Sequence, residues 1–346
     1  MAEETSALPP APRLYPWHAA AIEQMKSAWE ADRLPHAILL QGADGLGTRQ
    51  LAAWLAAAVL CESSTVTLQH CGKCASCQLI AAGSHPDLHW VRPEEGKQLI
   101  SVDQIRDDAV AKLTQTSYLQ GYKVVIVDPA HQMTPQAANS LLKTLEEPTP
   151  RSVLILVTSK PSSLLPTVRS RCQKLSVSSP PAQETLQWLQ QETGSVADRA
   201  LIEFTGNAPL RALEFAGERF STLDSDMQGA LNALVSGRAD VTHVAAEWTK
   251  KNELPELPNR LTWLDLWLTS VARRGIGGTA DLFTFPARST HLPSLPATLN
   301  ISAIYGVVDQ IRALKAQLVR TALQRELAIE SLLFAVLRVI APAPRH

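Results

Sequence analysis

The hydrophobic pattern predicts two different kinds of structure along the chain. In the first half, short runs that are apolar at almost every position alternate with segments of helical periodicity. Such runs are typical of strands that are buried on both faces of a parallel sheet. The clearest strands are 37–40, 123–127 and 153–157, and the predicted helices are 17–30, 48–60, 102–113 and 135–145. Alternating strands and helices predict an α/β domain with a parallel sheet.

After a Ser- and Pro-rich linker at 176–181, only helical patterns remain. Apolar residues recur at helical spacing around 261–271 and 301–318, and a segment rich in Gly, Pro, Ser and Thr at 276–296 predicts a loop between them. The predicted domains are an α/β domain at 1–179, a small helical domain at 180–220 and a helical domain at 221–346.

Composition excludes some classes of function. The 346 residues include 32 Lys and Arg and 33 Asp and Glu, giving a formal net charge of −1. This balance argues against nucleic-acid binding through a strongly cationic surface. The acidic, Pro-rich start has no signal-peptide pattern, and no run of 18 apolar residues predicts a membrane helix. We therefore expect a cytoplasmic protein, in which cysteines stay reduced unless they bind metal or act in catalysis.

A glycine-rich loop, formed by Gly42, Gly45 and Gly47, lies between a predicted strand and a predicted helix. The spacing Gly42-x4-Gly47 matches the Walker A frame, in which backbone amides hold phosphates. Thr48 replaces the lysine that contacts the β- and γ-phosphates, and Arg49 replaces the Ser or Thr that binds magnesium. We therefore expect a degenerate loop without ATP hydrolysis, although a turn that merely needs glycine gives the same pattern.

The strand predicted at 123–127 leads into Asp128, in the position of a Walker B carboxylate. Pro129 follows where an active ATPase of this class has a water-activating glutamate. Asp128 on its own is equally compatible with a residue that ends a strand or caps a helix. The two defects agree, since the phosphate-binding and water-activating groups are both missing.

Four cysteines lie close together in the sequence, at Cys61, Cys71, Cys74 and Cys77. The CxxCxxC spacing of the last three lets their sulfurs approach one tetrahedral ion, with Cys61 as the fourth ligand. A closed four-sulfur shell predicts a structural zinc ion in a module at 61–77. Reduced free thiols or a redox pair are the alternatives, and the sequence also offers His70 and His85 as fourth ligands.

Several motifs together carry a resemblance to a known family. Their order is Pro-His-Ala at 35–37, the glycine loop, the four cysteines, LLKTLEEP at 141–148 and Ser-Arg-Cys at 170–172. This set resembles the clamp-loader branch of the AAA+ proteins over most of residues 14–215, and 325–333 more weakly resembles the last helix of the family. A cysteine cluster, a broken nucleotide site and a retained Ser-Arg-Cys motif together resemble the delta' subunits of bacterial DNA polymerase III.

The resemblance implies a heteropentameric clamp loader with the motor subunits gamma and tau and the clamp-opening subunit delta. Such a complex places the sliding clamp on primer-template DNA during replication. The domain at 180–220 would be the AAA+ lid, and 221–346 the oligomerising collar. The chain would have no ATPase activity of its own, although it would belong to a DNA polymerase holoenzyme, which is a nucleotidyltransferase.

The resemblance also implies that Arg171 acts in trans on the ATP site of a neighbouring subunit. Arg169 is a second candidate, and a solvated arginine is the plainer alternative for either. Thr158 falls near the family's first sensor position. Arg211 lies one residue out of register with the second sensor and is given no role. An active AAA+ motor and a zinc-binding adaptor outside any ring remain alternative functions.

Overall fold

The computed structural model describes residues 11–64, 66–196, 198–250, 256–275, 300–318 and 324–340. The chain forms two compact units, which divide between Pro180 and Pro181. The loop predicted at 276–296 and the first ten residues lie outside the described residues.

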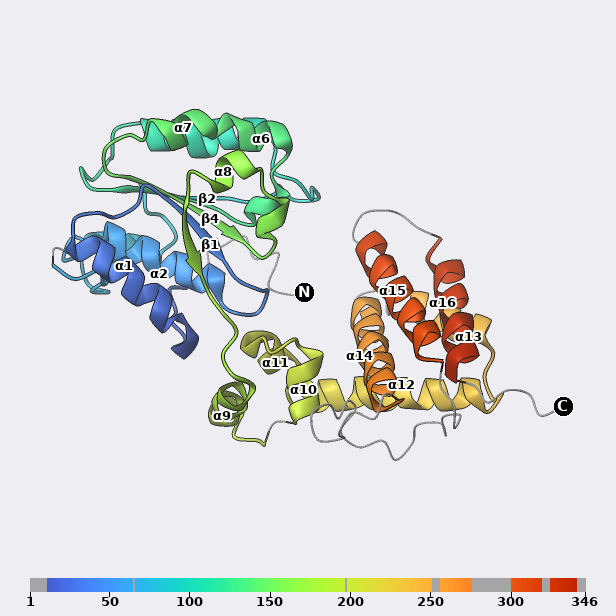
Figure 1. The fold of residues 1–346 in the computed structure, drawn as a ribbon. Helices are drawn as coiled ribbons and strands as arrows, with labels where there is room; N and C mark the ends of the chain where they lie inside the picture. The colour runs from blue at the N-terminus through green and yellow to red at the C-terminus, as the bar shows by residue number, and fades with distance from the viewer. Residues whose placement is uncertain are drawn as a thin grey trace. The chain divides into compact units, whose positions relative to one another are not determined.

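The first unit contains a sheet of five parallel strands in the order β2-β3-β4-β1-β5 (Figure 1). The strands are β1 (Ala37–Gln41), β2 (Leu88–Val91), β3 (Lys123–Val127), β4 (Ser152–Thr158) and β5 (Gln173–Ser176). Strand β1 lies between β4 and β5, with Leu39 opposite Leu156 on one side and Lys174 on the other. The parallel sheet confirms the predicted α/β class.

Both faces of the sheet are covered, which explains why its central strands are apolar at most positions. Ile38 and Leu40 face one layer of the core, whereas Ala37 and Leu39 face the other, as the two-residue period of a strand requires. Helices α1 (Ala19–Glu30) and α2 (Thr48–Leu60) pack on the first face. The second face carries α6 (Pro135–Ser140), α7 (Leu142–Glu146) and α8 (Pro166–Arg169), which Figure 1 shows on the opposite side of the sheet from α1 and α2.

The remaining segments of this unit are short. They are η1 (Pro16–His18), α3 (Ala75–Ala81), α4 (Val102–Gln104), η2 (Ile105–Val110), α5 (Ala111–Thr114), η3 (Ala130–Gln132), α6 (Pro135–Ser140), α7 (Leu142–Glu146), η4 (Pro161–Ser163) and α8 (Pro166–Arg169). The helix predicted at 102–113 contains a central π-helical segment, η2. The helix predicted at 135–145 is divided at Leu141, between α6 and α7.

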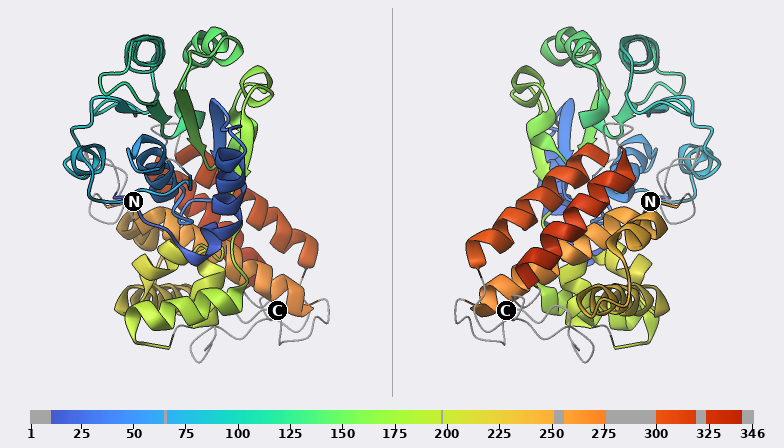
Figure 2. Two further views of the ribbon diagram at one scale, coloured as in Figure 1. Left: turned by 90° about the vertical axis from the view of Figure 1, so that its left-hand side faces the viewer. Right: turned by 90° about the vertical axis from the view of Figure 1, so that its right-hand side faces the viewer.

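Within its described residues, the second unit is helical, which confirms the predicted class. Its helices are α9 (Ala182–Thr193), α10 (Arg199–Phe204), α11 (Pro209–Phe215), α12 (Glu218–Val235), α13 (Val241–Thr249), α14 (Leu257–Gly275), α15 (Ile301–Leu318) and α16 (Arg325–Ile340). Helix α15 packs against α14 and α16, and Figure 2 shows the three as neighbours. Trp263 and Trp267 on α14 are buried and stacked, with ring centroids 5.9 Å apart. None of the described helices combines the length and apolarity needed to cross a membrane.

Candidate functional site

The glycine loop joins the end of β1 to the start of α2, as the sequence predicts, but protein atoms pack closely around it. A methyl group added at Gly42 would lie 2.8 Å from Thr48 Cγ2 and 3.1 Å from the carbonyl oxygen of Val177. Gly47 has a φ of +73°, in the left-handed region, and directly precedes α2. The two glycines are therefore required by local packing and backbone geometry, whether or not a phosphate binds.

An aromatic segment before α1 covers the loop. The indole Nε1 of Trp17 donates to the carbonyl of Leu46 at 2.8 Å, and His18 Nε2 lies 2.8 Å from the same oxygen. The rings of Tyr15 and Trp17 are stacked, with centroids 5.0 Å apart and an interplanar angle of 2°. Tyr15 packs directly on Gly47, where an added Cβ would lie 2.7 Å from its ring. The residues of this cover were not recognised in the sequence.

Gly47→Ala is expected to destabilise the α/β unit more than Gly96→Ala does. Both glycines have positive φ values, +73° and +77°, but only Gly47 has neighbours that an added methyl would meet. The backbone change costs about 1–2 kcal/mol at either position. Overpacking against Tyr15 adds about 1–3 kcal/mol at Gly47. Urea unfolding of the two variants measures the difference, and equal losses would contradict the packing of Tyr15 on the loop.

The Walker B position holds an ion-pair cluster. Asp128 follows β3, and its carboxylate is almost completely buried. Arg49 Nε, from the first turn of α2, lies 2.9 Å from Asp128 Oδ2 and 3.2 Å from Oδ1. Arg92 Nε, just after β2, lies 3.6 Å from the same Oδ2. Burial lowers the pKa of Arg92, and the charge of Asp128 partly opposes that shift. The sequence identified Arg49 and Asp128, but it gave no signal for Arg92.

Thr158, at the expected first sensor position, is the last residue of β4 and is buried. Its hydroxyl oxygen lies 3.1 Å from His131 Nδ1 and accepts a hydrogen bond from the Lys160 amide at 3.0 Å. These contacts tie the end of β4 to the segment that follows β3.

The stability of the α/β unit is expected to fall as the pH is lowered from 7 to 5.5. Burial lowers the pKa of His18, His85, His89 and His131, so each favours the neutral form when folded. The unfolded chain, with histidine pKa values near about 6.5, then binds more protons than the folded chain in this range. The stabilisation is complete at a pH above the histidine pKa of the unfolded chain. It is lost as the pH falls toward the lower histidine pKa values of the folded chain.

Urea unfolding at a series of pH values measures this dependence. His18→Gln removes one of the four titrating groups while keeping a polar side chain that can reach Leu46 O, so its slope between pH 7 and 5.5 should be shallower. A stability that is constant or rises on acidification in this range would contradict the prediction.

The four cysteines come together as the spacing predicts, with all four sulfur atoms within 4.8 Å of one another. The Sγ atoms of Cys61 and Cys74 are 3.9 Å apart, and those of Cys71 and Cys77 are 4.0 Å apart. A tetrahedral ion with metal–sulfur bonds of about 2.3 Å requires sulfurs about 3.8 Å apart, close to this arrangement. The cluster can therefore hold a metal ion, with one sulfur from the end of α2 and the others from the loop and start of α3.

The surroundings of the sulfurs shift the pKa values of two of the thiols in opposite directions. Backbone amides of Lys73 and Cys74 donate to Cys71 Sγ at 3.4 and 3.3 Å, and these hydrogen bonds lower the pKa of Cys71 to about 6. Burial has the opposite effect on Cys77 and raises its pKa to about 12. A bound divalent cation would favour the thiolate at both positions, since a coordinated thiol is deprotonated.

Neither of the two histidines weighed as fourth ligands belongs to this sulfur cluster. His85 Nε2 lies 2.8 Å from the Ser76 hydroxyl, which donates to the carbonyl of Leu60 at 2.7 Å. His85 Nδ1 accepts from the amide of Asp87, so Nε2 carries the proton of the neutral ring. His70 packs edge-on against Trp54. His85 therefore ties the cysteine segment to the start of β2.

Arg171 lies just beyond α8 and is exposed. Its Nη2 is 2.7 Å from Glu146 Oε1, its Nε donates to the same oxygen at 2.9 Å, and its Nη1 donates to the carbonyl of Thr167 at 3.0 Å. The LLKTLEEP and Ser-Arg-Cys motifs thus meet in space through Glu146 and Arg171. Cys172, the next residue, points into the core, and burial raises the pKa of its thiol to about 11.

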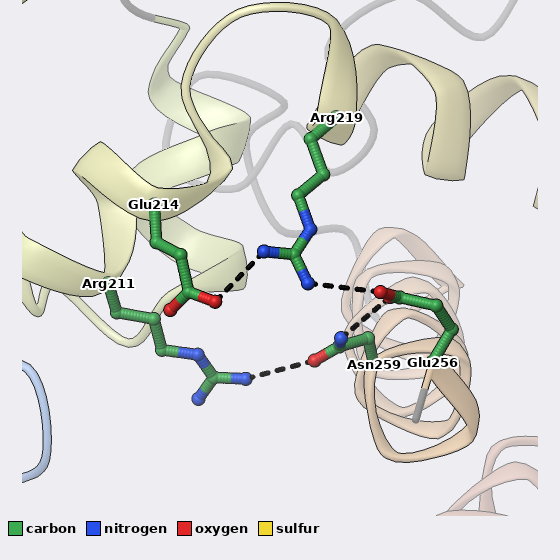
Figure 3. Close-up of polar contacts among 5 residues, drawn as sticks. All are labelled: Arg211, Glu214, Arg219, Glu256 and Asn259. Carbon is green, nitrogen blue, oxygen red and sulfur yellow. Dashed lines mark hydrogen bonds and ion pairs between the residues drawn. The ribbon is translucent and has the colours of Figure 1, made fainter. Parts of the chain in front are cut away.

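Arg211 lies in the helical unit, within a polar network between α11, α12 and α14 (Figure 3). Its Nη2 donates to Asn259 Oδ1 at 3.4 Å. Arg219 lies 2.8 Å from Glu214 and 3.0 Å from Glu256, and Glu256 accepts from Asn259 at 2.8 Å. The contacts of Arg211 are with residues of its own unit.

Comparison with known proteins gives the family. Residues 17–181 match the family described as DNA polymerase III, delta subunit. The DNA polymerase III subunit delta' of Escherichia coli is 32% identical over 334 residues, covering 95% of this chain and 97% of the relative. The chain belongs to the DNA polymerase III delta' family. The delta' subunit of Pseudomonas aeruginosa is 36% identical over 263 residues, covering 75% of this chain and 77% of its own.

The comparison with E. coli delta' extends through both units of the chain, so the assignment covers the helical unit as well as the sheet. Among solved structures, a gamma subunit-related protein of DNA polymerase III from Thermotoga maritima is 18% identical, with a TM-score of 0.41, and covers 93% of this chain and 99% of its own. That similarity is too low to carry an inference about the delta' site.

Proposed function

We propose that the chain is the non-hydrolysing delta' subunit of a DNA polymerase III clamp loader. In this role it helps place the sliding clamp on primed DNA and lends Arg171 to the ATP site of the neighbouring subunit. The expected partners are the motor subunits gamma and tau and the clamp-opening subunit delta, with the clamp and primer-template DNA reached through the complex. As a replication protein of bacteria, it would work in the cytoplasm.

The observation that carries the proposal is the contrast between the chain's own site and its Arg171. At its own site, Thr48 stands in the position of the phosphate-binding lysine, Arg49 stands in the position of the magnesium-binding hydroxyl, and Arg49 forms an ion pair with Asp128. Arg171 instead lies at the surface, with its guanidinium oriented by Glu146 and the carbonyl of Thr167. A planar, permanently charged group at a surface suits contact with phosphate oxygens of another subunit.

The sulfur cluster fits a structural zinc ion held by Cys61, Cys71, Cys74 and Cys77. Four cysteines with tetrahedral spacing satisfy zinc and leave no position for water or substrate, so the ion would support the fold. Cys61 ends α2 and Cys77 lies in α3, so the ion would join these two helices. We also propose that the helices of the second unit divide into a lid at 180–220 and an oligomerising collar at 221–346.

Reconstitution tests this function. The purified chain alone is expected to release no phosphate from ATP above a protein-free control. Adding it to gamma or tau and delta is expected to complete the complex and raise the rate of hydrolysis that depends on DNA and clamp. ATP turnover by the purified chain would favour the active-motor alternative. A chain that neither joins the complex nor changes its rate would favour the zinc-adaptor alternative.

A further inference from the structure

We propose that Arg49 and Arg92 replace a divalent cation at Asp128, so that the vestigial nucleotide site carries its own counter-charge and folds without magnesium. The inference rests on the part of the proposed function that makes this site non-hydrolysing. It holds whether or not Arg171 acts on a neighbour, because the groups involved all belong to one α/β unit.

The geometry places the two guanidinium groups around one buried carboxylate. The Asp128 side chain is 2% exposed, whereas those of Arg49 and Arg92 are 28% and 23% exposed. Arg49 stands where the Walker A frame has the hydroxyl ligand of magnesium, and Asp128 stands where the Walker B frame has the carboxylate. Arg49, in the position of one magnesium ligand, therefore supplies a cation that contacts Asp128, in the position of another.

The two guanidinium groups carry the same total charge as a divalent metal ion, and either leaves a net charge of +1 beside the single carboxylate of Asp128. Removing the ion-pair partners of a buried carboxylate is strongly destabilising, so the two arginines are expected to stabilise the folded state at Asp128. Arginine stays protonated in proteins, so this counter-charge does not depend on metal concentration. The covalent attachment of both cations also removes the need to recruit one from solution.

The fold also places Arg92 beside Asp128. Strands β2 and β3 are neighbours, and the Asp128 amide donates to the carbonyl of Val91 at 3.0 Å, which places residue 92 beside Asp128. The guanidinium of Arg92 also lies over the Trp90 ring, 4.8 Å from its centroid. A cation–π contact of this kind holds the charge in place. Arg92 is therefore part of the site rather than a mobile surface residue.

Thermal unfolding of the full chain tests the inference. Arg49→Met/Arg92→Met removes both charges but keeps much of the apolar side-chain volume, and it is expected to melt about 5–10 °C below the wild type. Adding Asp128→Asn, which removes the buried negative charge that the two arginines faced, should raise the melting temperature again. Divalent metals are removed by passing the buffer over a chelating resin before the protein is added. A soluble chelator is left out because it would also remove a metal ion from the cysteine cluster.

Manganese chloride at millimolar concentration provides the second measurement. It should raise the melting temperature of Arg49→Met/Arg92→Met, where the carboxylate is again available to a metal. The wild type and the triple variant with Asp128→Asn should show no such increase. If the double variant does not fold but the triple variant does, the outcome equally supports the inference.

The inference is overturned if the double variant melts with the wild type. It is also overturned if Asp128→Asn gives the double variant no recovery, or if manganese stabilises wild type and double variant equally. None of these readouts involves ATP turnover or a partner subunit, so they are independent of the role of Arg171.

Discussion

Replacing Arg171 with alanine is expected to slow ATP hydrolysis at the adjoining subunit's site by about a thousandfold. The side chain of Arg171 is exposed, so its loss should leave the fold and assembly of this subunit intact. In the structure its partners are Glu146 and a carbonyl oxygen at the surface, not core residues. The expected effect is therefore on the rate at one site rather than on the amount of complex formed.

The measurement needs a complex in which hydrolysis at the other motor sites is silenced. This requires the phosphate-binding lysine to be intact only in the motor subunit that adjoins this chain, with phosphate release followed in the presence of clamp and primed DNA. Arg171→Lys should recover little, because an ammonium group lacks the planar fork of guanidinium.

Arg169→Ala is the matched control, since it removes the second candidate arginine of the same segment. It should retain most of the rate. A large loss with Arg169→Ala and a normal rate with Arg171→Ala would contradict the assignment. Glu146→Gln should change the rate by no more than about fivefold, because an exposed ion pair contributes about 0.2–1 kcal/mol.

Replacing Cys77 with serine is expected to remove the bound zinc and to destabilise the α/β unit by at least about 4 kcal/mol. Cys77 is buried, and its sulfur lies 4.0 Å from that of Cys71. Helix α3 is only seven residues long and is too short to be stable without tertiary contacts. Losing the ion should therefore unfold α3 and the loop before it.

Metal analysis of the purified variant gives the zinc content, and thermal unfolding gives the stability. The expected change is from one equivalent of zinc to almost none. Cys172→Ser is the control, because Cys172 is also buried but belongs to the core beneath α8. It should keep its zinc. Full zinc retention in Cys77→Ser would contradict the four-sulfur site.

The strands that could be predicted are those buried on both faces. Strands β3 and β4 are buried at every position, so an unbroken apolar run was a sufficient signal. Strands β2 and β5, at the edges of the sheet, were not named from the sequence. Each has only four residues and only one fully buried position, so neither shows a clear pattern. Helix α3 is short, begins directly after Cys74 and contains Cys77, so the cysteine motif obscured its helical period.

The chemistry of the glycine loop could be predicted only in part. Motif spacing located Arg49 and Asp128 and showed which groups were missing. It could not show that these two side chains contact each other, because 79 residues separate them. Arg92 could not be found without β2, since its position beside Asp128 depends on the pairing of β2 with β3. The aromatic cover was missed for a similar reason, because Tyr15 contacts the loop only after the chain has folded.

The ion pairs of Arg219 connect three helical segments of the second unit. Glu214 belongs to α11, Arg219 to the first turn of α12, and Glu256 directly precedes α14, so one side chain spans 37 residues of sequence (Figure 3). A hinge needs a few residues whose backbone can rotate freely. Here Arg219, close to the junction between α11 and α12, forms ion pairs with Glu214 of α11 and with Glu256, the residue before α14. We therefore expect a movement of α11 to be coupled to a movement of α14.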